Sequence, residues 1–168
     1  MKTIYLAGGC FWGTQRFFDQ FDGIVKTEVG YANGGKPDPT YEDVCNDSGH
    51  AETVRIEYDE KIISTKELIQ YYFMVIDPTS VNRQGGDTGI QYRTGIYYED
   101  DSQLDVVMEV VRQEQSKYEK PIVVEVRPLE NYYKAEEYHQ KYLDKNPGGY
   151  CHINPRLMNL SKSLKRWK

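Results

Sequence analysis

The N-terminal segment places a strand-like stretch directly before a glycine pair and a helix-like stretch. Residues 3–7 are apolar, with β-branched and aromatic side chains, and predict a β-strand. Gly8-Gly9 interrupts this strand, and the spacing of the phenylalanines within residues 12–21 predicts a helix with one apolar side. A strand that turns at once into such a helix favours a fold in which helices pack on a sheet.

The rest of the chain continues this mixture, with strands separated by helices in some places and only by loops in others. Residues 52–58 alternate and predict a half-buried strand, and Ser64-x-x-Glu67 is a capping-box pattern that opens a helix running to residue 75. Further strands are expected at 25–31, 94–98 and 122–126, helices at 102–118 and 135–145, and loops at 32–40 and 77–93. We therefore expect one α+β domain over residues 1–168, in two layers, with a mixed β-sheet, packed helices and an irregular C-terminal tail.

Composition and charge exclude several classes of partner. The net charge of −5 argues against a nucleic acid or an anionic membrane, since both require a basic surface. The basic end at 162–168 is expected to be a solvated tail. No apolar run approaches the length of a membrane span, and the apolar start is too short for a signal peptide. A cytoplasmic protein is expected, and we take a monomer as the starting hypothesis.

Three cysteines, Cys10, Cys45 and Cys151, are the first candidates for chemistry. No pair has the Cys-x-x-Cys spacing of zinc or thioredoxin-type sites, and a structural disulfide framework is not expected in a cytoplasmic chain of this size. Cys10 stands at the start of a predicted helix, where unpaired N–H groups and the helix dipole favour a thiolate. Its alternative role is that of a small, buried and inert apolar residue.

A series of short motifs runs in order from about residue 4 to residue 152. The first, Gly9-Cys10-Phe11-Trp12-Gly13, combines a cysteine with two aromatic residues. The others are Gly30-Tyr31, Gly34-Gly35, Pro39-Thr40-Tyr41, Gly49-His50-Ala51-Glu52, Asp77-Pro78-Thr79, Arg83-Gln84-Gly85, Asp87, Gln91-Tyr92-Arg93, Asn146-Pro147 and Gly149-Tyr150-Cys151. In this order they resemble the A-type methionine sulfoxide reductases, a class of enzymes that restore oxidised methionine.

The resemblance implies a reductase for methionine sulfoxide, either free or in peptides and proteins, with selectivity for the S epimer. Cys10 would attack the sulfoxide sulfur while Glu52, a carboxylic acid partly removed from water, protonates the oxygen. The family also implies that Tyr41 and Tyr92 donate their hydroxyls to the same oxygen and that Asp87 organises the site. Phe11 and Trp12 would form the pocket for the methyl group of the substrate.

The resemblance also implies how the enzyme returns to its reduced state. Cys10 would be left as a sulfenic acid, which condenses with Cys151 to give a disulfide and water. A thioredoxin-type dithiol would then reduce this disulfide by exchange. No metal or organic cofactor is expected. The tail has no further cysteine, so one-step recycling through Cys151 is predicted.

Several alternatives remain open at this level. His50 or His139 is an alternative activator of Cys10, and Cys45 is either inert or an alternative recycling thiol. The stretch 45–49 looks shortened relative to the family loop, and Thr53 stands where an apolar residue is commoner. Three rival functions share some of these residues: a thiol peroxidase, a cysteine hydrolase, and a non-catalytic module that binds methionine-rich peptides. None of the three explains the ordered motifs.

Overall fold

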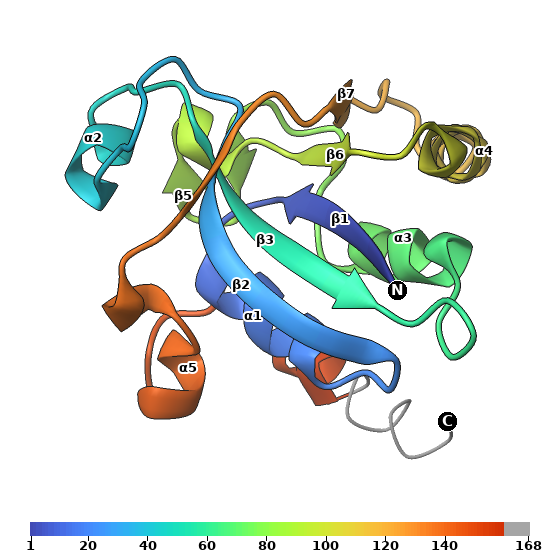
Figure 1. The fold of residues 1–168 in the computed structure, drawn as a ribbon. Coiled ribbons are helices and arrows are strands. Elements are labelled where there is room, and N and C mark those ends of the chain that lie inside the picture. The colour runs from blue at the N-terminus through green and yellow to red at the C-terminus, as the bar shows by residue number, and fades with distance from the viewer. Residues whose placement is uncertain (160–168) are drawn as a thin grey trace.

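A six-stranded sheet forms the centre of the computed structural model, which describes residues 1–159 (Figure 1). The strands lie in the order β7-β6-β1-β3-β2-β8. Their bounds are Lys2–Ala7 for β1, Ile24–Ala32 for β2, Ala51–Tyr58 for β3, Gly95–Tyr98 for β6, Glu125–Pro128 for β7 and Tyr132–Lys134 for β8. Neighbouring strands are antiparallel except for β6 and β7, which are parallel, so the predicted mixed sheet is confirmed.

Strand β3 occupies the middle of the sheet between β1 and β2. Its pairing with β1 places Ala7 opposite Thr53, so the end of β1 lies beside the start of β3. This register brings the glycine turn after β1 next to Glu52. The strand predicted at 52–58 is confirmed, and Arg55 and Glu57 are only partly buried, as a half-buried strand requires. Its first residues differ from the prediction, because Thr53 on one face and Val54 on the other are both fully buried.

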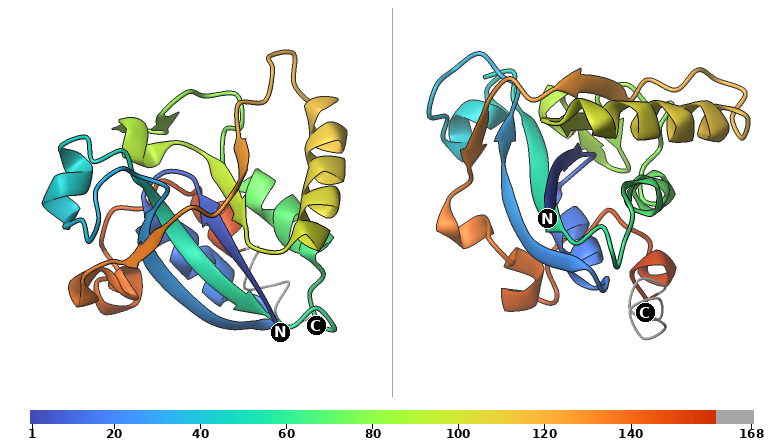
Figure 2. Two further views of the ribbon diagram at one scale, coloured as in Figure 1. Left: turned by 45° about the horizontal axis from the view of Figure 1, so that its top comes forward. Right: turned by 45° about the vertical axis from the view of Figure 1, so that its right-hand side comes forward.

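Three helices cover one face of the sheet. They are α1 (Phe11–Asp19), α3 (Thr65–Met74) and α4 (Asp101–Gln115), and the capping box predicted for Ser64 and Glu67 is present at the start of α3. Helix α1 lies behind β2 and β3, whereas α3 and α4 lie together near β1 and β6 (Figures 1 and 2). One apolar core joins them to the sheet through Ile4, Leu6, Phe17, Phe18, Phe21, Val54, Ile56, Leu68, Ile69, Ile96, Val107 and Val110.

The opposite face of the sheet has a smaller cover. The chain that leads from β7 into β8 crosses it in Figure 1, and Leu129 from this chain and Tyr132 from β8 pack on a second apolar cluster. The rings of Tyr5 and Tyr132 lie 5.1 Å apart there. This arrangement confirms an α+β domain in two layers, with the helices on one side.

Several element predictions need correction. The expected strand at 122–126 begins only at Glu125, and the short helix α2 (Tyr41–Cys45) was not predicted. The expected loop at 77–93 contains a small hairpin of β4 (Arg83–Gln84) and β5 (Asp87–Thr88), followed by the 3₁₀ turn η1 (Ile90–Tyr92). These short elements have too few residues to show a periodic pattern in the sequence.

The helix predicted at 135–145 is wrong, because the segment follows the edge of β2 instead. The Gln140 side chain accepts a hydrogen bond from the Val29 N–H at 3.0 Å and donates one to the Val29 carbonyl at 2.8 Å. Lys141 then adopts a left-handed conformation with φ 55°. Only a 3₁₀ turn, η2 (Glu137–His139), and a single helical turn, α5 (Tyr142–Lys145), remain.

The C-terminal part is irregular from residue 146 to 154 and helical at 155–159, so the predicted irregular tail is confirmed only in its first part. The basic end at 162–168 lies outside the described residues. Within residues 1–159, no helix is long and apolar enough to cross a membrane.

Candidate active site

Cys10 is held at the N-cap of α1 by the turn that follows β1. Gly9 takes a φ of +75°, a conformation that favours glycine, and its N–H donates to the Tyr92 carbonyl at 3.1 Å. The Cys10 side chain is buried, with 8% of its surface exposed. The turn therefore presents one shielded thiol at the start of a helix and ties it to the segment that carries Tyr92.

The electrostatic surroundings of Cys10 differ from those expected from its position alone. Burial raises the pKa of the Cys10 thiol well above its usual range, the charge of Glu52 raises it further, and only the Trp12 backbone N–H acts in the opposite direction. The preference for a thiolate that the helix N-terminus gives is therefore opposed by burial. Burial outweighs the helix N-terminus, and the resting group is a thiol.

Glu52 is the second residue of β3 and lies next to the Cys10 turn. Its Oε1 accepts a hydrogen bond from the Phe11 N–H at 3.2 Å, and only 2% of its surface is exposed. Burial raises the pKa of Glu52 to about 8, and the nearby charge of Asp87 contributes to the rise. At neutral pH this carboxyl group holds a proton, as a general acid must.

Two tyrosines, Tyr41 and Tyr92, share the surroundings of Glu52. Burial raises the pKa of each phenol above its usual range, and the charge of Glu52 is the next cause for both. The two hydroxyls are therefore protonated donors. Tyr41 begins α2, where a capping box joins Thr40 and Asp43, and its backbone N–H donates to Glu136 Oε2 at 2.9 Å.

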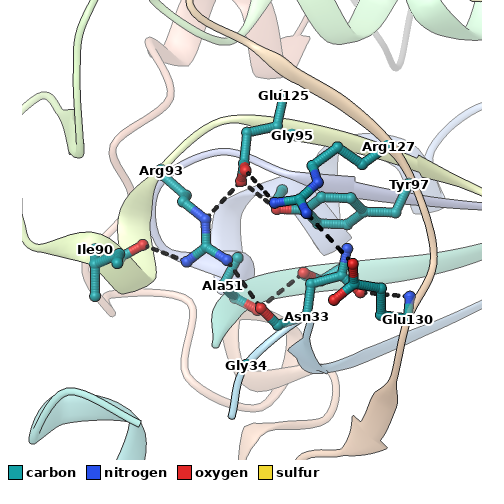
Figure 3. Close-up of polar contacts among 12 residues, drawn as sticks. Asn33, Gly34, Ala51, Ile90, Arg93, Gly95, Tyr97, Glu125, Arg127 and Glu130 are labelled. Carbon is teal, nitrogen blue, oxygen red and sulfur yellow. Dashed lines mark hydrogen bonds and ion pairs between the residues drawn. The ribbon is translucent and has the colours of Figure 1, made fainter. Parts of the chain in front are cut away.

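Arg93 fixes the turn that carries Tyr92 to two other parts of the molecule (Figure 3). Its Nη1 donates to the Ile90 carbonyl at 2.9 Å, its Nη2 to the Asn33 carbonyl at 3.3 Å, and its Nε to Glu125 Oε1 at 2.6 Å. These partners belong to η1, to the residue after β2, and to β7. The same Glu125 oxygen accepts from the Tyr97 hydroxyl at 3.0 Å. We refer to Arg93, Glu125, Asn33 and Tyr97 as the arginine network.

The hairpin of β4 and β5 supplies Asp87, whose charge raises the pKa of both Glu52 and Tyr92. Asp87 Oδ2 is buried and has no hydrogen-bond partner within residues 1–159. Burial raises the pKa of Tyr150 and the charge of Asp87 raises it further, so the Tyr150 hydroxyl lies near this carboxyl group. The charge of Asp87 also raises the pKa of Glu52, so the two carboxyl groups lie near each other.

An aromatic cluster adjoins Cys10 at the first turn of α1. The Trp12 ring stacks on Tyr142 with 3.8 Å between ring centroids, and its Nε1–H donates to His139 Nδ1 at 3.0 Å. The Phe11 ring lies 5.3 Å from the ring of His139. These contacts fix both aromatic residues beside the thiol. His139 therefore holds Trp12, whereas His50 shares a 2.8 Å hydrogen bond with Ser48, so neither histidine is placed by these contacts as the activator of Cys10.

The other two cysteines lie in different surroundings. Cys151 is half-buried and free, and its Sγ lies 2.8 Å from the position that a Cβ on Gly13 would take. Gly13 is in the first turn of α1, so Cys151 packs on the helix that begins after Cys10. Cys45 is exposed at the end of α2, and its presence contributes to raising the pKa of Tyr41. Within residues 1–159, no group of three or more potential ligands is arranged to hold a metal.

A family model described as peptide methionine sulfoxide reductase matches residues 2–168. The chain belongs to this family. It is 60% identical to the peptide methionine sulfoxide reductase MsrA of Clostridium acetobutylicum over 159 residues, which cover 94% of this chain and 98% of the relative. It is 55% identical to the MsrA of Lachnoclostridium phytofermentans over 163 residues, with 96% and 98% coverage.

Solved structures of the same family share the fold. The reduced form of Mxr1 from Saccharomyces cerevisiae matches with a TM-score of 0.86 and 41% identity, covering 91% of each chain. The methionine sulfoxide reductase A of Corynebacterium diphtheriae matches with a TM-score of 0.81 and 37% identity, covering 89% of this chain and 77% of that one. The similarity therefore extends over nearly the whole chain.

The structure brings the predicted reductase residues Cys10, Glu52, Tyr41 and Tyr92 together, with Asp87 close by and Phe11, Trp12 and Cys151 on or against the first turn of α1. No pattern in the sequence points to Glu125, Glu136 or His152. Arg93 stands in the motif Gln91-Tyr92-Arg93, but the resemblance gives it no role. His152 directly follows Cys151, and this adjacency was the one available signal.

Proposed function

We propose that this chain reduces methionine sulfoxide to methionine, with Cys10 as nucleophile and Glu52 as general acid. One observation carries the assignment. A buried carboxyl group with a pKa of about 8 accepts a hydrogen bond from the residue that directly follows the buried thiol. A sulfoxide oxygen is a poor leaving group until it is protonated. Cys10 supplies the attacking sulfur and Glu52, next to it, supplies the proton.

The first half-reaction conserves atoms between thiol and sulfoxide. The Cys10 sulfur attacks the sulfoxide sulfur as Glu52 gives its proton to the oxygen, and an S–S bond joins Cys10 to the substrate. The hydroxyl group then passes from the substrate sulfur to the Cys10 sulfur as the S–O bond of the substrate and this S–S bond break. Methionine leaves, Cys10 is a sulfenic acid, and the thiol proton returns Glu52 to its acid form. The thiol thus ionises only as substrate binds, which suits a buried cysteine.

The neighbouring residues orient the substrate. The Tyr41 and Tyr92 hydroxyls, kept protonated by burial, donate to the sulfoxide oxygen, while Asp87 organises the polar side of the site. Phe11 and Trp12 receive the methyl group, because thioethers and methyl groups pack well against aromatic rings. Substrate is taken either free or within peptides and proteins, as the S epimer.

The second half-reaction regenerates the enzyme. Cys151 attacks the sulfur of the Cys10 sulfenic acid, giving a Cys10–Cys151 disulfide and water. A thioredoxin-type dithiol then reduces this disulfide. In support, a structure of the yeast Mxr1 in complex with Trx2 matches this chain with a TM-score of 0.60 and 30% identity. A domain bounded by residues 1–168, a monomeric state and a cytoplasmic location stay predictions.

A single turnover without added reductant tests the proposal. Reduced protein is mixed with each epimer of a methionine sulfoxide peptide, and methionine and free thiols are counted. We expect about one equivalent of methionine from the S epimer, with loss of two thiols mapped to Cys10 and Cys151. Cys10→Ser should form none, Cys151→Ser should form methionine without a disulfide, and Cys45→Ser should match the parent. If neither epimer gives methionine although Cys10 is fully reduced, the proposal is contradicted.

A further inference from the structure

His152 lies against two glycines, Gly9 in the turn before Cys10 and Gly13 in the first turn of α1. Its Nε2 is 2.9 Å from the position of a Cβ on Gly9, the residue before Cys10. Its Nδ1 is 3.5 Å from the position of a Cβ on Gly13, the same point that lies 2.8 Å from Cys151 Sγ. One edge of the imidazole therefore faces the Cys10 turn and the other faces the side of Cys151.

The ring of His152 is buried, and apart from an approach to the Gly8 backbone it has no hydrogen-bonding neighbour among the described residues. Both ring nitrogens are shielded from solvent and have no hydrogen-bond partner within residues 1–159. Buried polar atoms are nearly always paired, so an unpaired imidazole needs an explanation, and one explanation is that it serves a reacting group. Burial lowers the pKa of His152 below its usual value, so the resting ring is neutral.

The surroundings favour one tautomer of this neutral ring. The Gly8 carbonyl faces the ring closely enough to oppose the fall in its pKa. Because Nε2 is the nitrogen on the side of the Gly8-Gly9 turn, the hydrogen belongs on Nε2, and this is an assignment from the neighbours. Nδ1 then has its lone pair free on the side of Gly13 where Cys151 Sγ also lies, while the resting Cys151 thiol donates to the Ile153 carbonyl at 3.8 Å. Asp87 from β5 is the charged group that acts on the ring, and it opposes the fall in pKa as well.

Cys151 has a need for such a base. Burial raises the pKa of its thiol, against weaker opposing effects of the Ile153 backbone and Arg16, so the resting group is protonated. A protonated thiol is a poor nucleophile toward the sulfur of a sulfenic acid. Its proton must leave as the S–S bond forms, and the departing hydroxide must gain one to become water.

We propose that His152 is the proton-transfer residue of the recycling step, a role that rests on the function proposed above. Nδ1 accepts the proton of the Cys151 thiol as its sulfur attacks Cys10. The S–S bond forms, the S–OH bond of the sulfenic acid breaks, and the proton passes from the imidazole to the leaving hydroxide. Two thiol-derived sulfurs end as a disulfide, one water leaves, and His152 returns to its neutral form.

Two substitutions separate proton transfer from packing. His152→Phe keeps a flat ring over the glycine turn but carries no proton acceptor, and His152→Asn keeps a polar group but is not basic at neutral pH. Each variant is mixed with one equivalent of methionine S-sulfoxide peptide in the absence of reductant. Methionine release, loss of free thiols and sulfenic acid trapped by dimedone are followed over time.

We expect both variants to release methionine at the parent rate and to form the disulfide about 10²-fold more slowly, the lower range for loss of a general base. Sulfenic acid should accumulate meanwhile. In the parent, the disulfide step should stay fast down to below pH 6.5, the usual His value. In the variants its rate should rise with pH as the Cys151 thiol ionises unaided.

The possible outcomes are distinct. Parent-like disulfide formation in both variants would overturn the role of His152 while leaving the reductase intact. Slowing in His152→Asn that is fully restored in His152→Phe would show that the ring only packs. Absence of methionine from the parent would instead contradict the proposed function. Thermal unfolding of each variant establishes that it is folded, and the second variant serves if one is not.

Discussion

The two sides of Cys10 are built in opposite ways. On the side of Tyr92, the arginine network satisfies its polar groups: Arg93 donates to three different segments, and Glu125 accepts from both Arg93 and Tyr97. On the side of Cys151, Asp87 Oδ2 and both nitrogens of His152 are buried without hydrogen bonds within residues 1–159. The arginine network therefore has its polar groups paired with protein, whereas these three buried atoms beside Cys151 are unpaired.

This difference matches what each side does in the proposed cycle. Glu52 and the tyrosines must hold the sulfoxide oxygen in one geometry, and fixed donors give a catalytic advantage only when they do not need to reorganise. The Cys151 side must move a sulfur toward Cys10 and pass on a proton. A side chain that is held by hydrogen bonds within the protein can neither move nor exchange a proton easily. The unpaired ring nitrogens of His152 are therefore consistent with proton transfer beside Cys151.

The largest effect should come from replacing Glu52, the general acid on the side of Tyr92. Glu52→Gln removes the proton source, and we expect the methionine burst to slow by about 10²–10⁴-fold, the usual range for a general acid. In the parent, the burst rate should fall as pH rises through about 8, where Glu52 loses its proton. The variant should lack this limb. A pH-dependent loss of the same size in Glu52→Gln would assign the acid to another residue.

How far the sequence predicts this arrangement depends on the kind of contact. The motif around Cys10 and the motif ending in Glu52 were both recognised, and the strand–turn–helix at Cys10 was expected. Their proximity follows from the register of β1 on β3, which places Ala7 opposite Thr53, and register is a property of the sheet that no local pattern predicts.

Two differences from local preference have the same origin. Gln140 belongs to a segment with helical spacing, but its amide replaces a missing strand partner at the edge of β2. The preference for a thiolate at Cys10 follows from the helix N-terminus alone. Burial of the turn in the folded protein has the opposite effect and raises the pKa of Cys10, and no local pattern predicts that burial. Contacts between distant parts of the chain decide both cases, and these outweigh local preference.

A smaller effect should come from the support behind Tyr92. Arg93→Ala removes three hydrogen bonds, one of them charged on both sides, and charged hydrogen bonds contribute about 1.5–3 kcal/mol each. We expect a lower kcat for methionine formation with little change in KM, because Tyr92 acts on the oxygen in the transition state. A lysine side chain has one compact charge and cannot span the three partners, so Arg93→Lys should restore little.

A double-mutant cycle shows whether Arg93 acts through Tyr92. In a Tyr92→Phe background, Arg93→Ala should have no additional effect on kcat, whereas independent effects would multiply. Arg127→Gln is the matched control: Arg127 also contacts Glu125, at 3.4 Å, but its side chain is 52% exposed. This variant should match the parent. Multiplicative effects of Arg93→Ala and Tyr92→Phe would break the comparison, since the network would then stabilise the fold without positioning the phenol.

The smallest effect is expected on the side of Cys151, where Gly13 contacts Cys151. A methyl group on Gly13 would lie 2.8 Å from Cys151 Sγ and 3.4 Å from the Ile153 side chain, so the tail must shift if alanine is introduced. We expect Gly13→Ala to leave the methionine burst unchanged and to slow disulfide formation several-fold. Quenched single turnovers with thiol counting measure both steps.

Stability measurements then separate this displacement from a general effect on α1. Alanine favours a helix over glycine by about 1 kcal/mol, so Gly13→Ala should stabilise the protein in a Cys151→Ala background, where no Sγ opposes the methyl group. With Cys151 present, the same change should give less stabilisation or none, as measured by urea unfolding of the reduced proteins. Equal stabilisation in both backgrounds, together with a normal rate of disulfide formation, would mean that the tail yields at no cost. In that case the Cys151 side is mobile enough for His152 to need no fixed position relative to Cys151.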